Sequence, residues 1–292
     1  MTTQNTVHYR TISVAGLDVF YREAGPDEGP VLLLLHGFPT SSHMFRNLLP
    51  LLADRYRVIA PDLPGFGFTT SPPATEFAYT FDHLAEVIDG FTQALGLAQY
   101  ALYIFDYGAP VGLRLALAHP ERVTALITQN GNAYLEGLSA GWDPYRQYWQ
   151  DPTPENRAAM RTALTWDTTQ FQYRHGTPDS TQVAPEAPAL DFWGLSRPGY
   201  DEMQLDLVLD YRTNPPLYPS FQEYFRTHRP PTLAVWGEND PFFLPAGAQA
   251  FRRDNPDAQV HLLPTGHFAL ETHVTEIADL IQAFLASVLV KA

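Results

Sequence analysis

The chain has 292 residues and not one cysteine, which excludes both a disulfide framework and a thiolate metal site. It has no run of about 18 apolar residues, the length that a membrane-spanning helix needs. The stretch from Met1 to His8 is polar and lacks the basic and apolar segments of a secretory leader. Together these absences predict a cytoplasmic protein.

Positive charge is also scarce in this sequence. Lysine and arginine number 18 against 32 aspartates and glutamates, which gives a net charge of −14, and Lys291 is the only lysine. A strongly negative surface repels nucleic acids and anionic membranes. The composition therefore predicts a small-molecule substrate, no nucleic acid and no membrane partner, and it disfavours a highly anionic substrate.

The stretch around Asp106 is the most informative part of the sequence. A short apolar run from Ala101 to Phe105 is typical of a buried strand, and the residues after Gly108 show helical spacing. Burial of an unpaired carboxylate at this junction is costly, but the amides of a helix N-terminus favour an anion there. Asp106 either caps the helix or stands on a nucleophile elbow, a sharp strand-to-helix turn that presents one side chain.

The usual sequence of such an elbow is G-x-S-x-G. Asp106 takes the place of the serine and Gly108 keeps the second glycine, whereas Ile104 replaces the first glycine. A bulky residue thus stands where close packing normally requires glycine. Either the elbow shifts, or smaller neighbours compensate for Ile104.

Apolar runs alternate with helical patterns along the chain. Strand-like runs bounded by turn residues occupy residues 9–14, 17–24, 31–35, 56–60, 101–105, 123–129, 232–236 and 259–263. Helices are expected from a cap at Ser42 to about Leu52, after a cap at Thr80, and over residues 275–288. This order predicts right-handed crossovers and a mostly parallel sheet.

The pattern changes between residues 132 and 228, where aromatic residues and prolines are frequent and no buried strand is indicated. We therefore expect a core domain of residues 1–131 and 229–292 with an inserted helical cap of residues 132–228. A cap and exposed edge strands are compatible with a homodimer.

Six short motifs follow the predicted strands in order. They are HGFP at 36–39, DLPGFG at 62–67, the elbow at Asp106, HPERV at 119–123, WGEND at 236–240 and GH at 266–267. Together they resemble the motifs of α/β-hydrolases with a helical cap, and above all the epoxide hydrolase and haloalkane dehalogenase branch. The resemblance covers nearly the whole chain. It implies a mostly parallel eight-stranded sheet flanked by helices, with no metal ion and no organic cofactor.

The resemblance also assigns a catalytic triad, with Asp106 as nucleophile, Asp240 as the orienting acid and His267 as base. A carboxylate is ionised near neutral pH and suits displacement at a saturated carbon, which leaves an ester on the enzyme. The imidazole then activates water to hydrolyse the ester, and Asp240 holds the imidazole in the useful tautomer. By resemblance, the backbone amides of Phe38 and Tyr107 stabilise the oxyanion of this second step.

Opening of an epoxide requires a proton donor for the departing alkoxide, and in epoxide hydrolases two cap tyrosines supply the proton. The segments DPYRQYWQDP and DYRTN are similar to the corresponding segments of that family and match at Tyr145 and Tyr211. Tyr148 and Tyr218 are the rival positions. All four tyrosines have an alternative role in packing the cap against the core.

Haloalkane dehalogenases usually hold the halide with a tryptophan just after the nucleophile and a tryptophan or asparagine after the His-Gly pair. Here those places hold Tyr107 and Phe38, which have no side-chain N–H. Some dehalogenases carry their acid after the sixth strand, where this chain has Asn130. Fluoroacetate dehalogenases carry arginines where this chain has Tyr107 and Pro110.

The sequence favours a hydrolase that opens a small to medium apolar epoxide to a diol through a covalent aspartyl ester. The first alternative is a hydrolytic dehalogenase of haloalkanes or haloacids with the same triad. The second is a catalytically silent α/β-hydrolase that serves as a binding protein. A serine esterase is disfavoured, because no serine stands at the elbow.

Overall fold

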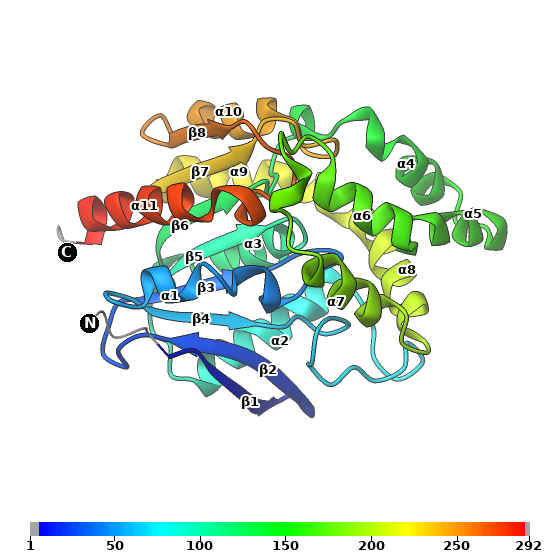
Figure 1. Ribbon diagram of the computed structural model, residues 1–292, viewed down its shortest axis with the longest axis horizontal. Helices are drawn as coiled ribbons and strands as arrows, with labels where there is room; N and C mark the ends of the chain where they lie inside the picture. The colour runs from blue at the N-terminus through cyan, green and yellow to red at the C-terminus, as the bar shows by residue number, and fades with distance from the viewer. Residues whose placement is uncertain (1–5, 290–292) are drawn as a thin grey trace.

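Eight strands form a single sheet in the computed structural model, which describes residues 6–289 (Figure 1). Their order in the sheet is β1-β2-β4-β3-β5-β6-β7-β8. β2 runs antiparallel to β1 and β4, and the remaining neighbours are parallel, as the sequence predicted. The strands are β1 (His8–Val14), β2 (Leu17–Ala24), β3 (Val31–Leu35), β4 (Arg57–Pro61), β5 (Tyr100–Phe105), β6 (Val123–Gln129), β7 (Thr232–Gly237) and β8 (Gln259–Leu263).

Helices make up most of the remaining described chain. The α-helices are α1 (Leu49–Leu52), α2 (Phe81–Ala94), α3 (Gly108–Ala118), α4 (Asp143–Gln150), α5 (Pro154–Ala159), α6 (Trp166–Arg174), α7 (Glu186–Leu195), α8 (Tyr200–Asp210), α9 (Asn214–His228), α10 (Pro245–Asp254) and α11 (Leu270–Leu289). Short 3-10 helices are η1 (Ser42–Phe45), η2 (Pro120–Arg122), η3 (Leu135–Gly137), η4 (Ala140–Trp142), η5 (Met160–Leu164), η6 (Ser180–Gln182) and η7 (Tyr211–Thr213).

Both faces of the sheet are covered, because successive side chains of a strand point to opposite faces. In β3, Leu33 and Leu35 join a core formed with α2, α3, α9 and α10. Leu32 and Leu34 join a second core, formed with α1 and α11 on the other face. The continuous apolar run of β3 is thus explained by burial on both sides.

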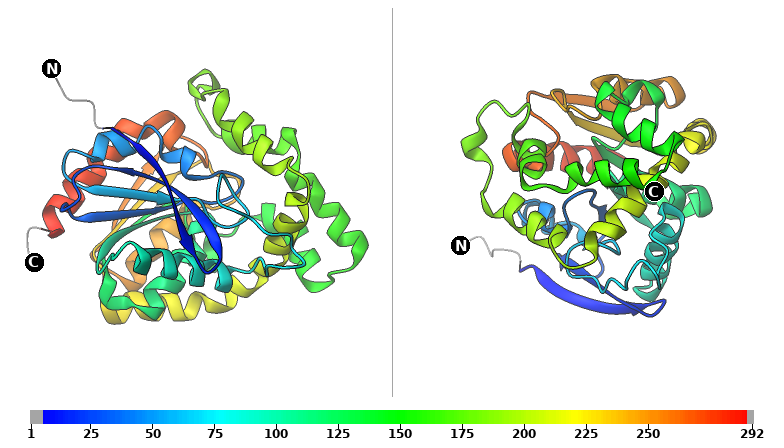
Figure 2. Two further views of the ribbon diagram at one scale, coloured as in Figure 1. Left: turned by 90° about the horizontal axis from the view of Figure 1, so that it is seen from below. Right: turned by 90° about the vertical axis from the view of Figure 1, so that its right-hand side faces the viewer.

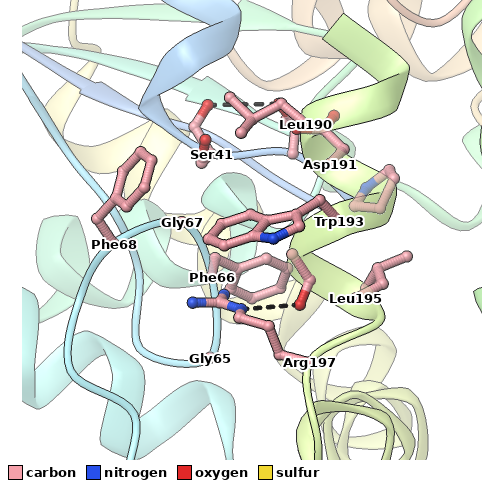
Figure 3. A pocket seen from close by; sticks show the side chains of 13 residues that line it. Ser41, Gly65, Phe66, Gly67, Phe68, Leu190, Asp191, Trp193, Leu195 and Arg197 are labelled. Carbon is pink, nitrogen blue, oxygen red and sulfur yellow. Dashed lines mark hydrogen bonds between the residues drawn. The ribbon is translucent and has the colours of Figure 1, made fainter. Parts of the chain in front are cut away.

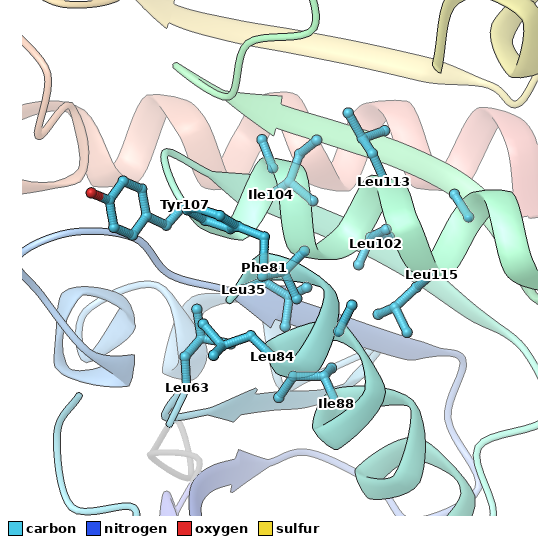
Figure 4. Packing of buried hydrophobic residues seen from close by; sticks show 14 of the residues in the cluster. Leu35, Leu63, Phe81, Leu84, Ile88, Leu102, Ile104, Tyr107, Leu113 and Leu115 are labelled. Carbon is cyan, nitrogen blue, oxygen red and sulfur yellow. The ribbon is translucent and has the colours of Figure 1, made fainter. Parts of the chain in front are cut away.

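The first core meets the base of the elbow (Figure 4). Leu84 of α2 and Leu113 of α3 belong to the same cluster as the strand residues Leu102 and Ile104, and all four are fully buried. Burial of side chains of this size contributes roughly 1.5–3 kcal/mol each relative to exposure. The packing fixes where β5 ends and α3 begins.

The chain between β6 and β7 is helical. Within residues 132–228 no strand is formed, apart from an isolated bridge between Leu138 and Phe243. Helices α4 to α8 lie beyond the carboxyl ends of the parallel strands, and α9 returns along α3 (Figures 1 and 2). The two ends of the described chain lie on the opposite side of the molecule (Figure 1).

Three local expectations are corrected by the structure. The cap after β3 is Ser41, whose Oγ accepts from the His43 amide at 3.3 Å, and the expected helix from Ser42 to Leu52 is divided into η1 and α1. Pro50 has no N–H, so a continuous helix through this point would lose a hydrogen bond. The closing helix α11 begins before residue 275 and is irregular at His273. The cap at Thr80 is confirmed by its bond from the His83 amide.

Candidate active site

Asp106 stands on a sharp turn between β5 and α3. Its φ of +46° is rare for a residue with a side chain, and Asp is one of the few types that tolerate it. Ile104 is accommodated by Gly112 one turn into α3, where a Cβ would lie 2.6 Å from Ile104 Cγ2. A smaller neighbour thus compensates for the missing glycine, and the elbow is formed.

The carboxylate of Asp106 is buried and faces backbone amides. Its Oδ1 accepts a hydrogen bond from the Phe38 amide at 2.6 Å, and the Tyr107 amide donates to the same carboxylate. A Cβ on Gly37 would lie 2.3 Å from Oδ1, so glycine is required for the loop to approach so closely. Burial raises the pKa of Asp106 to about 6, although His267 and the two amides act in the opposite direction.

His267 joins the two aspartates. Its Nδ1 lies 2.7 Å from Oδ2 of Asp240, and its Nε2 lies 3.9 Å from Oδ2 of Asp106. Oδ1 of Asp240 accepts from the amides of Phe242 and Phe243 at 2.7 and 3.1 Å. The structure thus brings together all three residues of the predicted triad, each from a loop at the carboxyl end of a strand.

The protonation of His267 depends on both aspartates. Burial lowers its pKa, but the charge of Asp240, the hydrogen bond to Asp240 and the charge of Asp106 outweigh this effect, so the pKa lies above its ordinary value. Conversion of Asp106 to a neutral ester would remove one of these charges. The pKa of His267 would then fall, which favours the neutral imidazole that a base requires.

Asn130 holds the side chain of Asp240, a contact that the sequence did not indicate. Its Nδ2 donates to Asp240 Oδ2 at 2.7 Å, and its Oδ1 accepts from the Gly237 amide at 3.0 Å. The available signal was a polar residue at the end of β6, beside the strand that carries the acid. From the sequence, this position stands out only as the place where some dehalogenases carry their acid.

A cavity of about 30 Å³ opens in front of Asp106. Its walls come from the elbow, the loop after β3, the helical segment 132–228 and the loop after β7. The lining residues are Phe38, Asp106, Tyr107, Trp142, Tyr145, Ala163, Gln172, Val208 and Phe242.

The predicted tyrosines differ in their access to this cavity. Tyr145 lines it, and its hydroxyl has no hydrogen-bond partner among residues 6–289. Burial and the charge of Asp106 raise the pKa of Tyr145 to about 12, so the hydroxyl keeps its proton at neutral pH. Tyr211 is buried and does not line the cavity. Its ring stacks on that of Trp149, with the ring centroids 5.7 Å apart, and its hydroxyl forms a hydrogen bond with Tyr218.

The rival Tyr148 packs in a separate cluster of the helical segment. Its hydroxyl accepts from Arg157 Nη1 at 3.3 Å, and it does not border the cavity. Tyr218 bonds to Tyr211 and to Asn132, so it stands one step further from Asp106 than Tyr211 does. Of the four tyrosines considered, Tyr145 is the one on the cavity wall.

Indole N–H groups near the cavity are already engaged. Nε1 of Trp142 donates to the Phe242 carbonyl at 3.1 Å, and Nε1 of Trp149 donates to the Val208 carbonyl at 2.7 Å. Neither indole can hold a ligand without breaking a bond to the backbone.

Residues 30–274 match the model of the alpha/beta hydrolase fold family. The chain belongs to this family. A yeast relative named "Uncharacterized hydrolase YNR064C" (Saccharomyces cerevisiae) is 46% identical over 276 residues, which cover 93% of this chain and 94% of the relative. The hydrolase is also similar to both branches expected from the motifs.

A "Haloalkane dehalogenase" of Mycobacterium marinum is 39% identical over 131 residues, 42% of this chain and 43% of the relative. Mouse "Epoxide hydrolase 3" is 27% identical over 95% of this chain and 76% of the relative. The crystal structure of haloalkane dehalogenase DbeA from Bradyrhizobium elkani has a TM-score of 0.80 with 24% identity, covering 98% of this chain and 100% of that one. This last likeness concerns the fold alone.

The hydrolase has a second, narrow cavity, of about 10 Å³, between α7 and the loops after β3 and β4 (Figure 3). Trp193 and Arg197 line it from α7 and the loop that follows, and Arg197 Nε donates to the Gly194 carbonyl at 3.0 Å. Phe66 lines this cavity and packs edge-on against Tyr107 of the first one. None of the triad residues borders it.

Among residues 6–289 of the hydrolase, no group of three or more histidine, aspartate or glutamate side chains has an arrangement that could hold a metal ion. Within the same range, no helix combines the length and the apolar character needed to cross a bilayer.

Proposed function

We propose that the protein is an epoxide hydrolase, which converts a small to medium epoxide to a diol through an ester on Asp106. The observation that carries the proposal is that one cavity holds both the carboxylate of Asp106 and the unpartnered hydroxyl of Tyr145. In this proposal residues 132–228 form a cap domain over a core of residues 1–131 and 229–292, since Tyr145 and Asp106 come from the two parts.

In the first step Asp106 attacks a carbon of the epoxide ring. Oδ2 is the attacking atom, because Oδ1 is held by the Phe38 amide. The carbon–oxygen bond of the ring breaks, and the alkoxide takes the proton of the Tyr145 hydroxyl. The product is a hydroxyalkyl ester on Asp106, and solvent later returns a proton to Tyr145.

In the second step water attacks the ester carbonyl. His267 takes a proton from the water, and Asp240 stabilises the resulting imidazolium. The negative charge develops on Oδ1, where the Phe38 and Tyr107 amides stabilise it. Collapse of the intermediate releases the diol oxygen, which takes the proton from the imidazolium. The Asp106 carboxyl that remains releases the second proton of the water to solvent, which regenerates the carboxylate.

A hydrolytic dehalogenase is the second candidate, since dehalogenases are among the relatives and would use the same nucleophile. The side chains that line the cavity favour a dehalogenase less than an epoxide hydrolase. The Trp142 indole is engaged, and Phe38 and Tyr107 have no side-chain N–H. Gln172 is left as a single amide donor on the wall.

The proposal is tested by trapping the ester. His267→Ala removes the base of the second step, so the ester should accumulate on Asp106. The variant is incubated with panels of epoxides and haloalkanes, and adducts are measured by intact-protein mass spectrometry and mapped by peptide. An adduct with the full mass of the epoxide supports the proposal. An adduct with the alkyl group minus its halogen supports the dehalogenase instead.

Two controls make the trap specific. Asp106→Ala in the same background should abolish the adduct, whereas His119→Ala, a change at a surface ion pair with Asp89, should leave turnover intact and trap nothing. A single turnover in isotopically labelled water should place the heavy oxygen in the Asp106 peptide. Heavy oxygen in the diol alone would mean direct attack by water, and the proposal would fail.

A further inference from the structure

Gln172 of α6 is a buried polar residue that the proposed mechanism does not use. It lines the same cavity as Asp106, and only 4% of its surface is exposed. Its amide makes no hydrogen bond to any residue from 6 to 289. Neither amide atom is sealed off from the cavity, because neither is among the fully enclosed polar atoms that lack a partner.

The other polar groups on this wall already have a role or a partner. Asp106 accepts from backbone amides, and no hydrogen bond joins it to Gln172. The Trp142 indole donates to the backbone. The remaining wall near Gln172 includes the apolar Ala163 and Val208. Gln172 is thus an isolated amide on a mostly apolar wall, without a contact to the nucleophile.

An amide in this position discriminates between ligands. A buried polar group without a partner is unfavourable, and a ligand that supplies the missing hydrogen bond removes the penalty, whereas an apolar ligand of the same shape leaves it in place. Sites built in this way select strongly for the ligand that carries the polar group.

The charge of that group is also constrained. No lysine, arginine or histidine lines the cavity, and the one charged side chain on its wall is the carboxylate of Asp106. An anionic substituent would be repelled by Asp106 and would find no counter-ion. A glutamine offers both an N–H donor and a carbonyl acceptor, so it matches a neutral hydroxyl, ether or carbonyl group.

We propose that Gln172 is a specificity-determining residue, which selects epoxides with a neutral hydrogen-bonding group on the carbon chain away from the ring. The inference rests on the proposed function and deepens it, since it replaces a wholly apolar substrate with one that has a single polar end. Tyr145 and Asp106 act on the ring, and Gln172 binds the other end.

The test uses matched pairs of terminal epoxides that end in either a hydroxyl or a methyl group, at a series of chain lengths. For the unmodified protein, the ratio of kcat/KM for hydroxyl over methyl should reach at least tenfold at one or more lengths. In Gln172→Leu the ratio should fall to about one, with the methyl series unchanged or faster. Gln170→Leu is the matched control, because it is the same change on the same helix outside the cavity.

Two results would overturn the inference while leaving the epoxide hydrolase intact. One is a ratio near one at every chain length in the unmodified protein. The other is an equal loss for both series in Gln172→Leu, which would place the amide in general packing or at the ring. A failure of the proposed function is distinguishable, since no epoxide would then turn over and the His267→Ala trap would stay empty.

Discussion

At the scale of single residues, the candidate nucleophile occupies an energetically unfavourable position. Asp106 combines a left-handed backbone conformation with burial of its carboxylate, and burial raises its pKa to about 6. Strained backbone of this kind persists only where the surroundings fix it, here the packing of β5 against α3. With a pKa of about 6 the carboxylate is still mostly ionised at neutral pH, and it is more basic than an exposed aspartate.

The raised pKa of Asp106 has a measurable consequence for the pH dependence of ester formation. A protonated carboxyl is not a nucleophile, so the rate of ester formation in single turnovers should be constant above pH 7 and fall about tenfold per pH unit below about pH 6. Rapid quenching of the unmodified protein separates this step from ester hydrolysis. In His267→Ala the fall should begin at a higher pH, because the charge of His267 lowers the pKa of Asp106. A rate that stays constant down to pH 4.5 would contradict the assignment of Asp106.

The tyrosines give a second prediction at this scale. Tyr145→Phe should slow epoxide opening at least a hundredfold, since general acid catalysis contributes 10²–10⁴ and Tyr145 borders the cavity. Tyr211→Phe should cost less, about tenfold, because its hydroxyl faces Tyr218. Tyr148→Phe should stay within about twofold. The measurement is the single-turnover rate of ester formation, and equal rates in all three variants would refute the role of Tyr145.

At the scale of elements, the sequence predicted the strands better than the helices. The predicted strands 31–35, 123–129 and 259–263 coincide with β3, β6 and β8 to the residue. Burial of β3 and β6 on both faces leaves little choice of residue type there, whereas β8 is a partly exposed edge strand. The helices were predicted less well, since Pro50 interrupts the expected helix after Ser42 and α10, whose buried face holds mainly small residues such as Gly247 and Ala248, was not expected. The elbow was recognised, but its stability could not be judged from Ile104 alone.

The close approach of Gly112 to Ile104 can be tested with a double-mutant cycle. Gly112→Ala should lower the free energy of unfolding by about 1–3 kcal/mol, because the new methyl would overlap Ile104 Cγ2. In an Ile104→Ala background the same change should be neutral or stabilising, since alanine favours a helix interior by about 1 kcal/mol. Denaturant unfolding of the four proteins gives the coupling. Additive effects would show that the two side chains do not compete for space.

The candidate site was predictable where it depends on loops at the ends of strands. The order of strands places Asp106, Asp240 and His267 at one edge of a parallel sheet, so their proximity follows from the sequence pattern. The choice of Tyr145 over Tyr148, and the roles of Asn130 and Gln172, depend on how the helices of the segment 132–228 pack. No periodicity in the sequence encodes that packing.

At the scale of the whole molecule, a buried carboxyl joins the helical segment to the sheet domain. Asp191 of α7 accepts a hydrogen bond from Tyr173 at 2.5 Å and another from Thr40 of the loop after β3. Burial raises the pKa of Asp191 to about 8, and the two hydrogen bonds lower it only in part. The junction therefore favours a protonated carboxyl.

The free energy of unfolding should fall as rising pH ionises the Asp191 carboxyl. Its pKa is raised in the folded state, so ionisation costs stability progressively from about pH 4 and the cost is complete above about pH 8. Asp191→Asn should raise the free energy of unfolding at pH 8.5 by roughly 2–5 kcal/mol and leave it unchanged near pH 4. Thermal unfolding of both proteins between pH 4 and pH 8.5 measures this gain in stability. Asp167→Asn, the same change at an exposed position, is the control. A stability gain independent of pH would contradict the assignment.

Both ends of the described chain lie on the side away from α4 to α8 (Figure 1). A tether, an affinity tag or a fused domain at either end would therefore project from the rear of the molecule. If the protein were attached to a surface through either of these ends, helices α4 to α8 would face the bulk solution. Because the chain has no cysteine, a single cysteine introduced on α4 or α8 would attach a thiol-reactive dye at one defined position of the immobilised protein.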